Sequence, residues 1–232
     1  MTTFVDRARR ARVLADRYPA SREILEFYSG VATWQGEVAP SVSSFDDLGS
    51  KLESLIHLVS QIGPSALVST AKDIDPTKFD QVARDQWESP GEFSTLEFFA
   101  RTLIQVYATQ LPEGLDCPWC GQNPQVGCLR TQGDGQGFDL VCALCCRRHA
   151  VMRGKCPACD ESDQSLLLTY STPDFEHLRL KACESCQGYL LVVDLEKEIQ
   201  AIPEVDELAG LPLDLWAVQK GYWKLQPNLV GI

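Results

Sequence analysis

Four Cys-x-x-Cys pairs are the residues of this chain whose type and spacing could do chemistry. All ten cysteines lie within residues 117–186, and eight of them form these pairs. Two thiolates three positions apart on a tight turn point to the same side, so one tetrahedral metal ion can accept both at about 2.3 Å. Two pairs complete one site, and the sequence therefore predicts two bound metal ions. The predicted ligands are Cys117, Cys120, Cys142, Cys145, Cys156, Cys159, Cys183 and Cys186.

The order of the pairs allows two ways of building two sites. Gaps of 21, 10 and 23 residues separate consecutive pairs. The first and third gaps are typical of zinc ribbons and rubredoxin-like sites, whereas the second is too short for the same hairpin. An internal repeat of about 40 residues, with "CPWC" over "CPAC" and "CALC" over "CESC", favours tandem sites built from consecutive pairs. A cross-braced arrangement, first pair with third and second with fourth, remains open.

Two other uses of the thiols fit the sequence less well. The first twenty residues set arginines among small residues, unlike a signal peptide, so we expect a cytoplasmic protein whose thiols stay reduced rather than forming disulfides. Thioredoxin-like chemistry needs one Cys-x-x-Cys pair at the start of a helix, and four pairs among hairpins do not match it.

The remaining cysteines and histidines are expected to play smaller parts. Cys128 falls in the middle of a predicted strand and should be a buried apolar residue. Cys146 should be a spectator beside a site, although an alternative ligand and a reactive thiol are other readings. His149 and His177 are not expected to be ligands, because eight thiolates already satisfy two ions. His57 should lie at the surface.

Composition excludes several classes of partner. The chain has 232 residues, 44% of them hydrophobic, which is enough to bury a core. The formal net charge of −11 argues against nucleic-acid binding, which needs clustered Lys and Arg. No stretch approaches the roughly 18 apolar residues of a membrane span, so we expect no membrane insertion. The oligomeric state stays open.

Before the cysteines, the sequence favours helices. "SSFDDLGSKLESLIHLVSQIGP" (43–64) spaces apolar residues three and four apart between a serine cap and a Gly-Pro stop, which predicts one amphipathic helix. The apolar stripes are expected to form core, and a docking groove for a partner is the other reading. Further helices are predicted over 3–18, 21–34, 64–73, 77–87 and, after a capping box, 94–112.

After the helices, hairpins and a last helix are predicted. The short β-prone runs are 125–130, 138–142, 166–171, 177–183 and 189–196, and the helix spans 206–222 with a restart at Pro212. The expected fold class is α+β, with a hinge at "PEGLD" (112–116). We expect a helical domain over 1–113, a first rubredoxin-like or zinc-ribbon-like metal module over 114–154, a second over 155–203, and a C-terminal helix and tail over 204–232.

The four pairs with their flanks resemble the FdhE family of formate dehydrogenase accessory proteins. The motifs that carry the resemblance are "CPWCG", "LTY" after the third pair, "CESCQGYL" and the ending "LPLDLWAVQKGYWKLQPN". They cover about residues 110–228, whereas the N-terminal part matches only in its helical character. One departure is that Arg147, Arg148 and His149 stand where relatives tend to carry an aromatic residue.

The resemblance implies a cytoplasmic maturation protein that binds the catalytic subunit of a molybdenum- or tungsten-dependent formate dehydrogenase. It also implies iron as the metal, two ions per chain, although zinc accepts the same geometry. A four-thiolate site has no open position for a substrate, so we expect no enzyme activity. The alternative function is that of a rubredoxin-like iron protein in electron transfer or redox sensing.

Overall fold

The computed structural model describes residues 2–88, 94–112, 117, 120 and 122–231. The helices are α1 (Phe4–Arg17), α2 (Arg22–Val38), α3 (Leu52–Ile62), α4 (Ser65–Asp73), α5 (Pro76–Glu88), α6 (Thr95–Ala108), α7 (Pro203–Ala209) and α8 (Leu211–Gln219). The strands are β1 (Pro124–Gln132), β2 (Gly135–Cys142), β3 (Arg148–Ala150), β4 (Leu167–Tyr170), β5 (Leu178–Cys183), β6 (Gly188–Asp194) and β7 (Trp223–Lys224). The predicted α+β class is confirmed.

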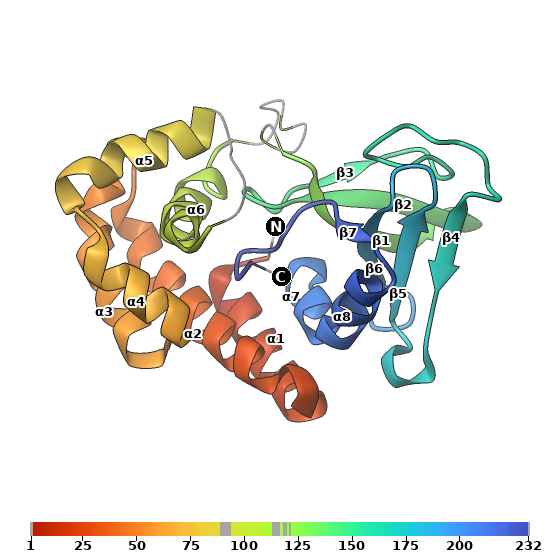
Figure 1. Cartoon of the computed structure of the whole chain (residues 1–232), viewed down its shortest axis with the longest axis horizontal. Coiled ribbons are helices and arrows are strands. Elements are labelled where there is room, and N and C mark those ends of the chain that lie inside the picture. Colours follow the sequence, from red (N-terminus) through yellow and green to blue (C-terminus); the bar gives the residue numbers. More distant parts are fainter. Residues whose placement is uncertain (1, 89–93, 113–116, 118–119, 121, 232) are drawn as a thin grey trace.

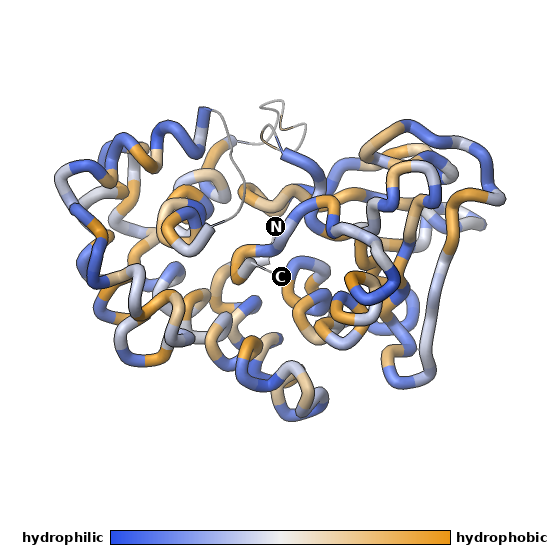
Figure 2. The backbone as a smooth tube through the Cα atoms, in the orientation of Figure 1, coloured by the Kyte–Doolittle hydropathy of each residue, from blue (hydrophilic) through white to orange (hydrophobic). Residues whose placement is uncertain are grey.

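Helices α1 to α6 form one half of the molecule, the helical half (Figure 1). Hydrophobic and hydrophilic segments recur in turn along these helices (Figure 2), as is typical of amphipathic helices that pack one face on a common core. Helix α6 differs because it is buried almost all round, including Arg101, Thr102 and Gln105. It therefore lies inside the molecule, with the other helices on one side and the cysteine-rich region on the other (Figure 1).

The predicted single helix over 43–64 is wrong in its first part. Residues Phe45–Asp47 and Gly49–Lys51 form 3₁₀ turns, and the α-helix begins only at Leu52. The Asp47 carboxylate accepts hydrogen bonds from the backbone N–H groups of Ser43 and Ser44, which closes a separate turn there. Gly49 then packs on α5, since a Cβ at this position would lie 2.2 Å from Asp80 Oδ1.

Among the described residues, seven strands form one sheet in the order β3-β2-β1-β6-β5-β4, with β7 also paired to β6. The internal repeat is visible in this order, because β3-β2-β1 and β6-β5-β4 are equivalent antiparallel units. The two units join where β1 runs parallel to β6, with Gly127 opposite Val192. The tandem modules are therefore not separate bodies but two halves of one sheet.

Helices α7 and α8 cover one face of this sheet (Figure 1). Leu178 and Leu180 of β5 and Leu191 and Val193 of β6 point to that face and belong to the main core. Gly210 permits the close approach, since a Cβ there would lie 2.6 Å from Leu191 Cδ1. The opposite face carries a smaller cluster of Leu129, Phe138, Leu140, Leu190, Val192 and Leu225.

A buried ion pair joins the helical half to α7. Arg10 on α1 donates through Nε to Asp206 Oδ2 at 2.9 Å, and His177 Nε2 lies 3.0 Å from the other oxygen of this carboxylate. Asp206 is fully buried, so the pair holds α1 against α7. The predicted domain limits stay predictions, and the expected hinge at 112–116 lies, apart from Pro112, outside the described residues. None of the described helices combines the length and hydropathy of a membrane span.

Candidate metal centres

The structure brings the eight predicted ligands together in two groups of four. Centre 1 comprises Cys117, Cys120, Cys142 and Cys145, and centre 2 comprises Cys156, Cys159, Cys183 and Cys186. Within each centre the four Sγ atoms lie within 4.8 Å of one another. The pairs are therefore grouped in the tandem order and not in the cross-braced order.

Each centre is built by the ends of one hairpin. In centre 1 the first pair precedes β1 and the second pair follows the end of β2, and β1 and β2 are antiparallel neighbours. Centre 2 repeats this plan with β4 and β5. Because the two units have the same orientation, both centres lie at the same edge of the sheet, separated by three strand spacings, or on the order of 14 Å.

The sulfur–sulfur distances fit a metal ion. The Sγ atoms of Cys156 and Cys186, and those of Cys159 and Cys183, are 3.7 Å apart. In centre 1, Cys117 Sγ lies 3.6 Å from Cys120 Sγ and 3.3 Å from Cys145 Sγ. Sulfurs held at about 2.3 Å around one tetrahedral ion lie about 3.8 Å apart, whereas a disulfide needs about 2.05 Å. The cysteines are accordingly free thiols in a metal-binding arrangement.

Tight turns aim the sulfurs inward. The backbone N–H of Leu144 donates to Cys142 Sγ and that of Gly188 to Cys186 Sγ, both at 3.4 Å. In three pairs the residue after the second cysteine has a left-handed backbone, with φ of 54° at Cys146, 59° at Asp160 and 58° at Gln187. Such hydrogen bonds favour thiolates and orient them before an ion binds.

This repeated turn explains Cys146. It occupies the position that Asp160 and Gln187 hold in centre 2, so its side chain turns away from the ligand cluster. Gln105 on α6 donates to Cys146 Sγ at 3.5 Å and to the Ala143 carbonyl at 3.2 Å. Burial raises the pKa of this thiol to about 12. Cys146 is therefore a buried neighbour of centre 1, as predicted.

Charge on the thiols depends on a cation. Hydrogen bonds from Cys120, Cys142 and Cys145 hold the pKa of Cys117 far below its usual value, while the pKa of Cys142 is raised because it donates to Cys117 and is buried. The pKa of Cys145 is also lowered, to about 7, whereas hydrogen bonding to Cys117 raises the pKa of Cys120 as well as that of Cys142, so two of the four thiols resist ionisation. A divalent ion would convert all four to thiolates, release their protons and leave a net charge of −2 at the centre.

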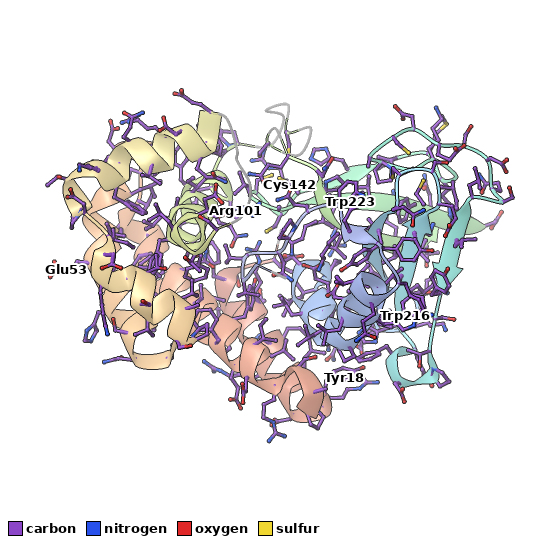
Figure 3. The ribbon with its side chains drawn as sticks, in the orientation of Figure 1. Tyr18, Glu53, Arg101, Cys142, Trp216 and Trp223 are labelled. Atoms are coloured by element: carbon purple, nitrogen blue, oxygen red, sulfur yellow. The ribbon has the colours of Figure 1, made fainter. Side chains whose placement is uncertain are left out.

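The two centres differ in exposure. Three of the four cysteines of centre 1 are buried, whereas Cys159 in centre 2 is exposed. Arg101 on α6 lies near Cys142 (Figure 3), and burial lowers the pKa of Arg101 to about 10 against the opposing charges of Glu97 and Cys142. Centre 2 instead has Trp223 beside it, whose Nε1 donates to the Cys186 carbonyl at 2.7 Å. Centre 1 is a joint with the helical half, and centre 2 faces outward.

The other residues singled out in the sequence are placed as follows. Cys128 is fully buried in β1, as predicted. His149 is not among the four cysteines that form centre 1. His177 lies at Asp206, away from both centres, and His57 is exposed beside Gln61. Strand β3, which carries His149, was not predicted, because its three residues give no periodic signal.

Comparison with known proteins agrees with this architecture. The family described as FdhE, C-terminal domain, matches residues 154–230, which include centre 2, α7 and α8. The crystal structure of the FdhE protein from Pseudomonas aeruginosa superposes with a TM-score of 0.75 at 23% identity, covering 98% of this chain and 95% of that one. That likeness shows a shared fold over the helices as well as the sheet.

Curated relatives give the same result in sequence. An FdhE homologue from Haemophilus ducreyi is 26% identical over 99% of this chain and 90% of its own length, and one from Pseudomonas aeruginosa is 36% identical over 49% of this chain. In the homologues from Aquifex aeolicus, Pseudomonas aeruginosa and Pseudomonas putida, the aligned part is only 41%, 38% and 43% of the relative's length. The resemblance that the sequence indicates is thus confirmed: residues 154–230 match an FdhE C-terminal domain, and the chain resembles FdhE homologues over nearly its whole length.

Proposed function

We propose that this protein is a formate dehydrogenase accessory protein that acts in the cytoplasm. It binds the catalytic subunit of a molybdenum- or tungsten-dependent formate dehydrogenase and supports the assembly of that enzyme. The observation that carries the proposal is the pair of four-cysteine centres at one sheet edge, in a chain that resembles FdhE homologues from its helices to its last strand.

The chemistry of the centres supports a role without turnover. Four thiolates occupy all four coordination positions of a tetrahedral ion, which leaves no position for a substrate or an activated water. Within the described part of the chain, these two centres are the groups of three or more His, Cys, Asp or Glu side chains close enough to hold a metal. We propose iron as the ion at each centre, with zinc as the alternative, because both accept four sulfur ligands in this geometry.

A deletion strain tests the proposal. Loss of the gene should lower formate dehydrogenase activity while the catalytic polypeptide is still made, and the wild-type gene should restore it. The double variant Cys142→Ser/Cys145→Ser should fail to restore activity, because it removes half of centre 1. The matched control is Cys128→Ala, a buried cysteine outside both centres, which should restore activity. Normal activity in the deletion strain would overturn the proposal.

Binding can be measured directly by co-purification with the catalytic subunit. The protein carries 32 acidic and 21 basic residues, so a complex steered by charge should weaken as salt is added. Binding that is indifferent to salt indicates an apolar contact instead. Failure to co-purify under either condition would contradict a direct role in assembly.

A second function, in electron transfer or redox sensing, is favoured by one feature. Cys159 is exposed, so an ion in centre 2 could exchange electrons with a partner at the surface. The test is a reversible visible spectrum on reduction and reoxidation of iron-loaded protein. Loss of that change in Cys156→Ser/Cys159→Ser would assign it to centre 2. Protein that is prepared anaerobically and stays colourless after reoxidation would indicate zinc and remove this function.

A further inference from the structure

A cationic groove lies beside centre 2, on the face of the sheet that α7 and α8 leave uncovered. Its volume is about 330 Å³, within the usual range of small-molecule sites. The floor is apolar and includes Phe138, Leu190 and Leu225, while three cations line the walls: Arg153, Lys155 and Lys181. No carboxylate occurs among the described residues that line it, although Cys156 and Cys183 of centre 2 also belong to the lining.

These three cations have no acidic partner in the described part of the chain. None of the ion pairs formed there includes Arg153, Lys155 or Lys181. The Lys181 ammonium lies instead 4.6 Å from the centre of the Phe138 ring, and Arg153 and Arg179 act on it as like charges. In a protein of net charge −11, three cations gathered on an apolar floor need an explanation.

The groove is formed before any ligand arrives. Gln164 donates from Nε2 to the carbonyl oxygens of Gly154 and Ser162, both at 3.0 Å, which fixes the loop that bears Arg153 and Lys155. Gly154 has φ of 88°, a left-handed conformation that glycine adopts without strain. The floor is equally fixed, because Gly127 leaves room for the Phe138 ring, which a Cβ there would approach to 2.8 Å.

A competing explanation is that the cations only balance the negative charge of centre 2. The internal repeat argues against this as a general requirement of the module. Leu140 of β2 occupies the position two before the cysteine that Lys181 occupies in β5, and Asp116 precedes Cys117 where Lys155 precedes Cys156. The cations at positions 155 and 181 are therefore not shared by the equivalent positions of the first unit. In addition, cations that only neutralise the charge of centre 2 would not require a groove beside it.

We propose that this groove binds a small organic dianion of the phosphate-monoester class, with its charged group between Arg153, Lys155 and Lys181 and its apolar part on Phe138 and Leu225. Three cations that line one groove favour a doubly charged group over a single carboxylate, and Arg and Lys are the side chains that bind phosphate. The apolar floor indicates that the ligand carries an apolar part next to its phosphate group. The inference does not depend on the proposed accessory function.

Calorimetric titration of the metal-loaded full chain with phenyl phosphate tests the proposal. Phenyl phosphate should bind saturably, and more tightly than inorganic phosphate, which lacks the apolar body, or benzoate, which carries one charge. Lys181→Met should weaken phenyl phosphate at least about tenfold, because it removes a desolvated charge partner. The matched control Lys197→Met changes an exposed lysine outside the groove and should leave the affinity unchanged.

Metal content is measured in every variant to separate the two explanations. Should Lys181→Met lose metal from centre 2, the exposed Arg153→Gln decides, since it changes the groove without touching a strand. Weaker phenyl phosphate binding in Arg153→Gln with two ions retained supports the site. The proposal is overturned by absence of saturable binding to the wild type, or by equal affinities in Arg153→Gln and Lys197→Met.

Discussion

A buried trio of charges makes the stability of this protein depend on pH. Lys224 Nζ lies 3.5 Å from Glu207 Oε2 and 3.3 Å from Asp214 Oδ1, and all three side chains are buried. Gln125 donates to Glu207, and the Tyr189 hydroxyl donates to Asp214 at 2.9 Å. Two carboxyl groups thus share one ammonium. Burial raises the pKa of Glu207 to about 7, against the opposing effect of Lys224.

The sign and size of the effect follow from this raised pKa. The ordinary value for Glu207 is 4.5, so folding takes up a proton between pH 4.5 and 7. As far as this group is concerned, the free energy of unfolding is therefore highest below pH 4.5. It falls as the pH rises from 4.5 to 7. A shift of this size corresponds to about 3 kcal/mol in total. Most of this loss should fall between pH 5 and pH 8.5.

The variant Glu207→Gln removes the titrating group and keeps an oxygen for Gln125. Its free energy of unfolding relative to wild type should rise by about 2–3 kcal/mol from pH 5 to pH 8.5. The measurement is urea denaturation of metal-loaded protein followed by circular dichroism. Comparison at each pH cancels the contribution of the thiolate centres. Any constant offset reflects the lost ion pair, so only the slope with pH tests the reasoning.

Glu53→Gln is the matched control, because Glu53 projects from α3 on the outside of the helical half (Figure 3). It should change the stability by less than about 0.5 kcal/mol throughout the pH range. A Glu207→Gln difference that stays flat from pH 5 to 8.5 would refute the reasoning, since it would mean that Glu207 keeps its charge across this range.

Three further predictions concern the two centres and the ion pair between α1 and α7. Elemental analysis should find two ions per chain and one in Cys156→Ser/Cys159→Ser, because each centre holds its ion independently; a single ion in the wild type would contradict the two-centre arrangement. A colorimetric chelator should remove the ion of centre 2 before that of centre 1, since Cys159 is exposed and centre 1 lies behind α6; reversed order would show that exposure does not control release. Arg10→Met should lower the free energy of unfolding by about 3–5 kcal/mol because it leaves Asp206 buried without its main partner, and a loss below about 1 kcal/mol in urea denaturation would show that His177 alone suffices.

Local signals made the centres predictable. A Cys-x-x-Cys pair specifies its own turn, and two β-prone runs between consecutive pairs specify the hairpin that unites them. The same reasoning placed Cys128 in the core, because it falls mid-strand between apolar neighbours. The helices were found from their period and caps, except at 43–64, where the side chain of Asp47 closes an earlier turn.

Contacts between distant segments could not be predicted in this way. The parallel pairing of β1 with β6 unites the two modules, yet each strand reads alone as an ordinary β-prone run. The ion pair of Arg10 with Asp206 links residues 196 positions apart, and nothing near either residue indicates the other. The role of Cys146 had a signal in the repeat, because it aligns with Gln187, but only the left-handed backbone shows why that position matters.

The two units have the same strand order but different surroundings. In the first unit, Gln35 donates to Gln105 at 3.1 Å, and Gln105 in turn donates to Ala143 beside centre 1. Loss of an ion there would disturb contacts that run into α2 and α6. In the second unit, the exposed Cys159 and the cationic groove face outward. Centre 1 thus lies against the helical half of the molecule, whereas centre 2 and the groove beside it are open to solvent.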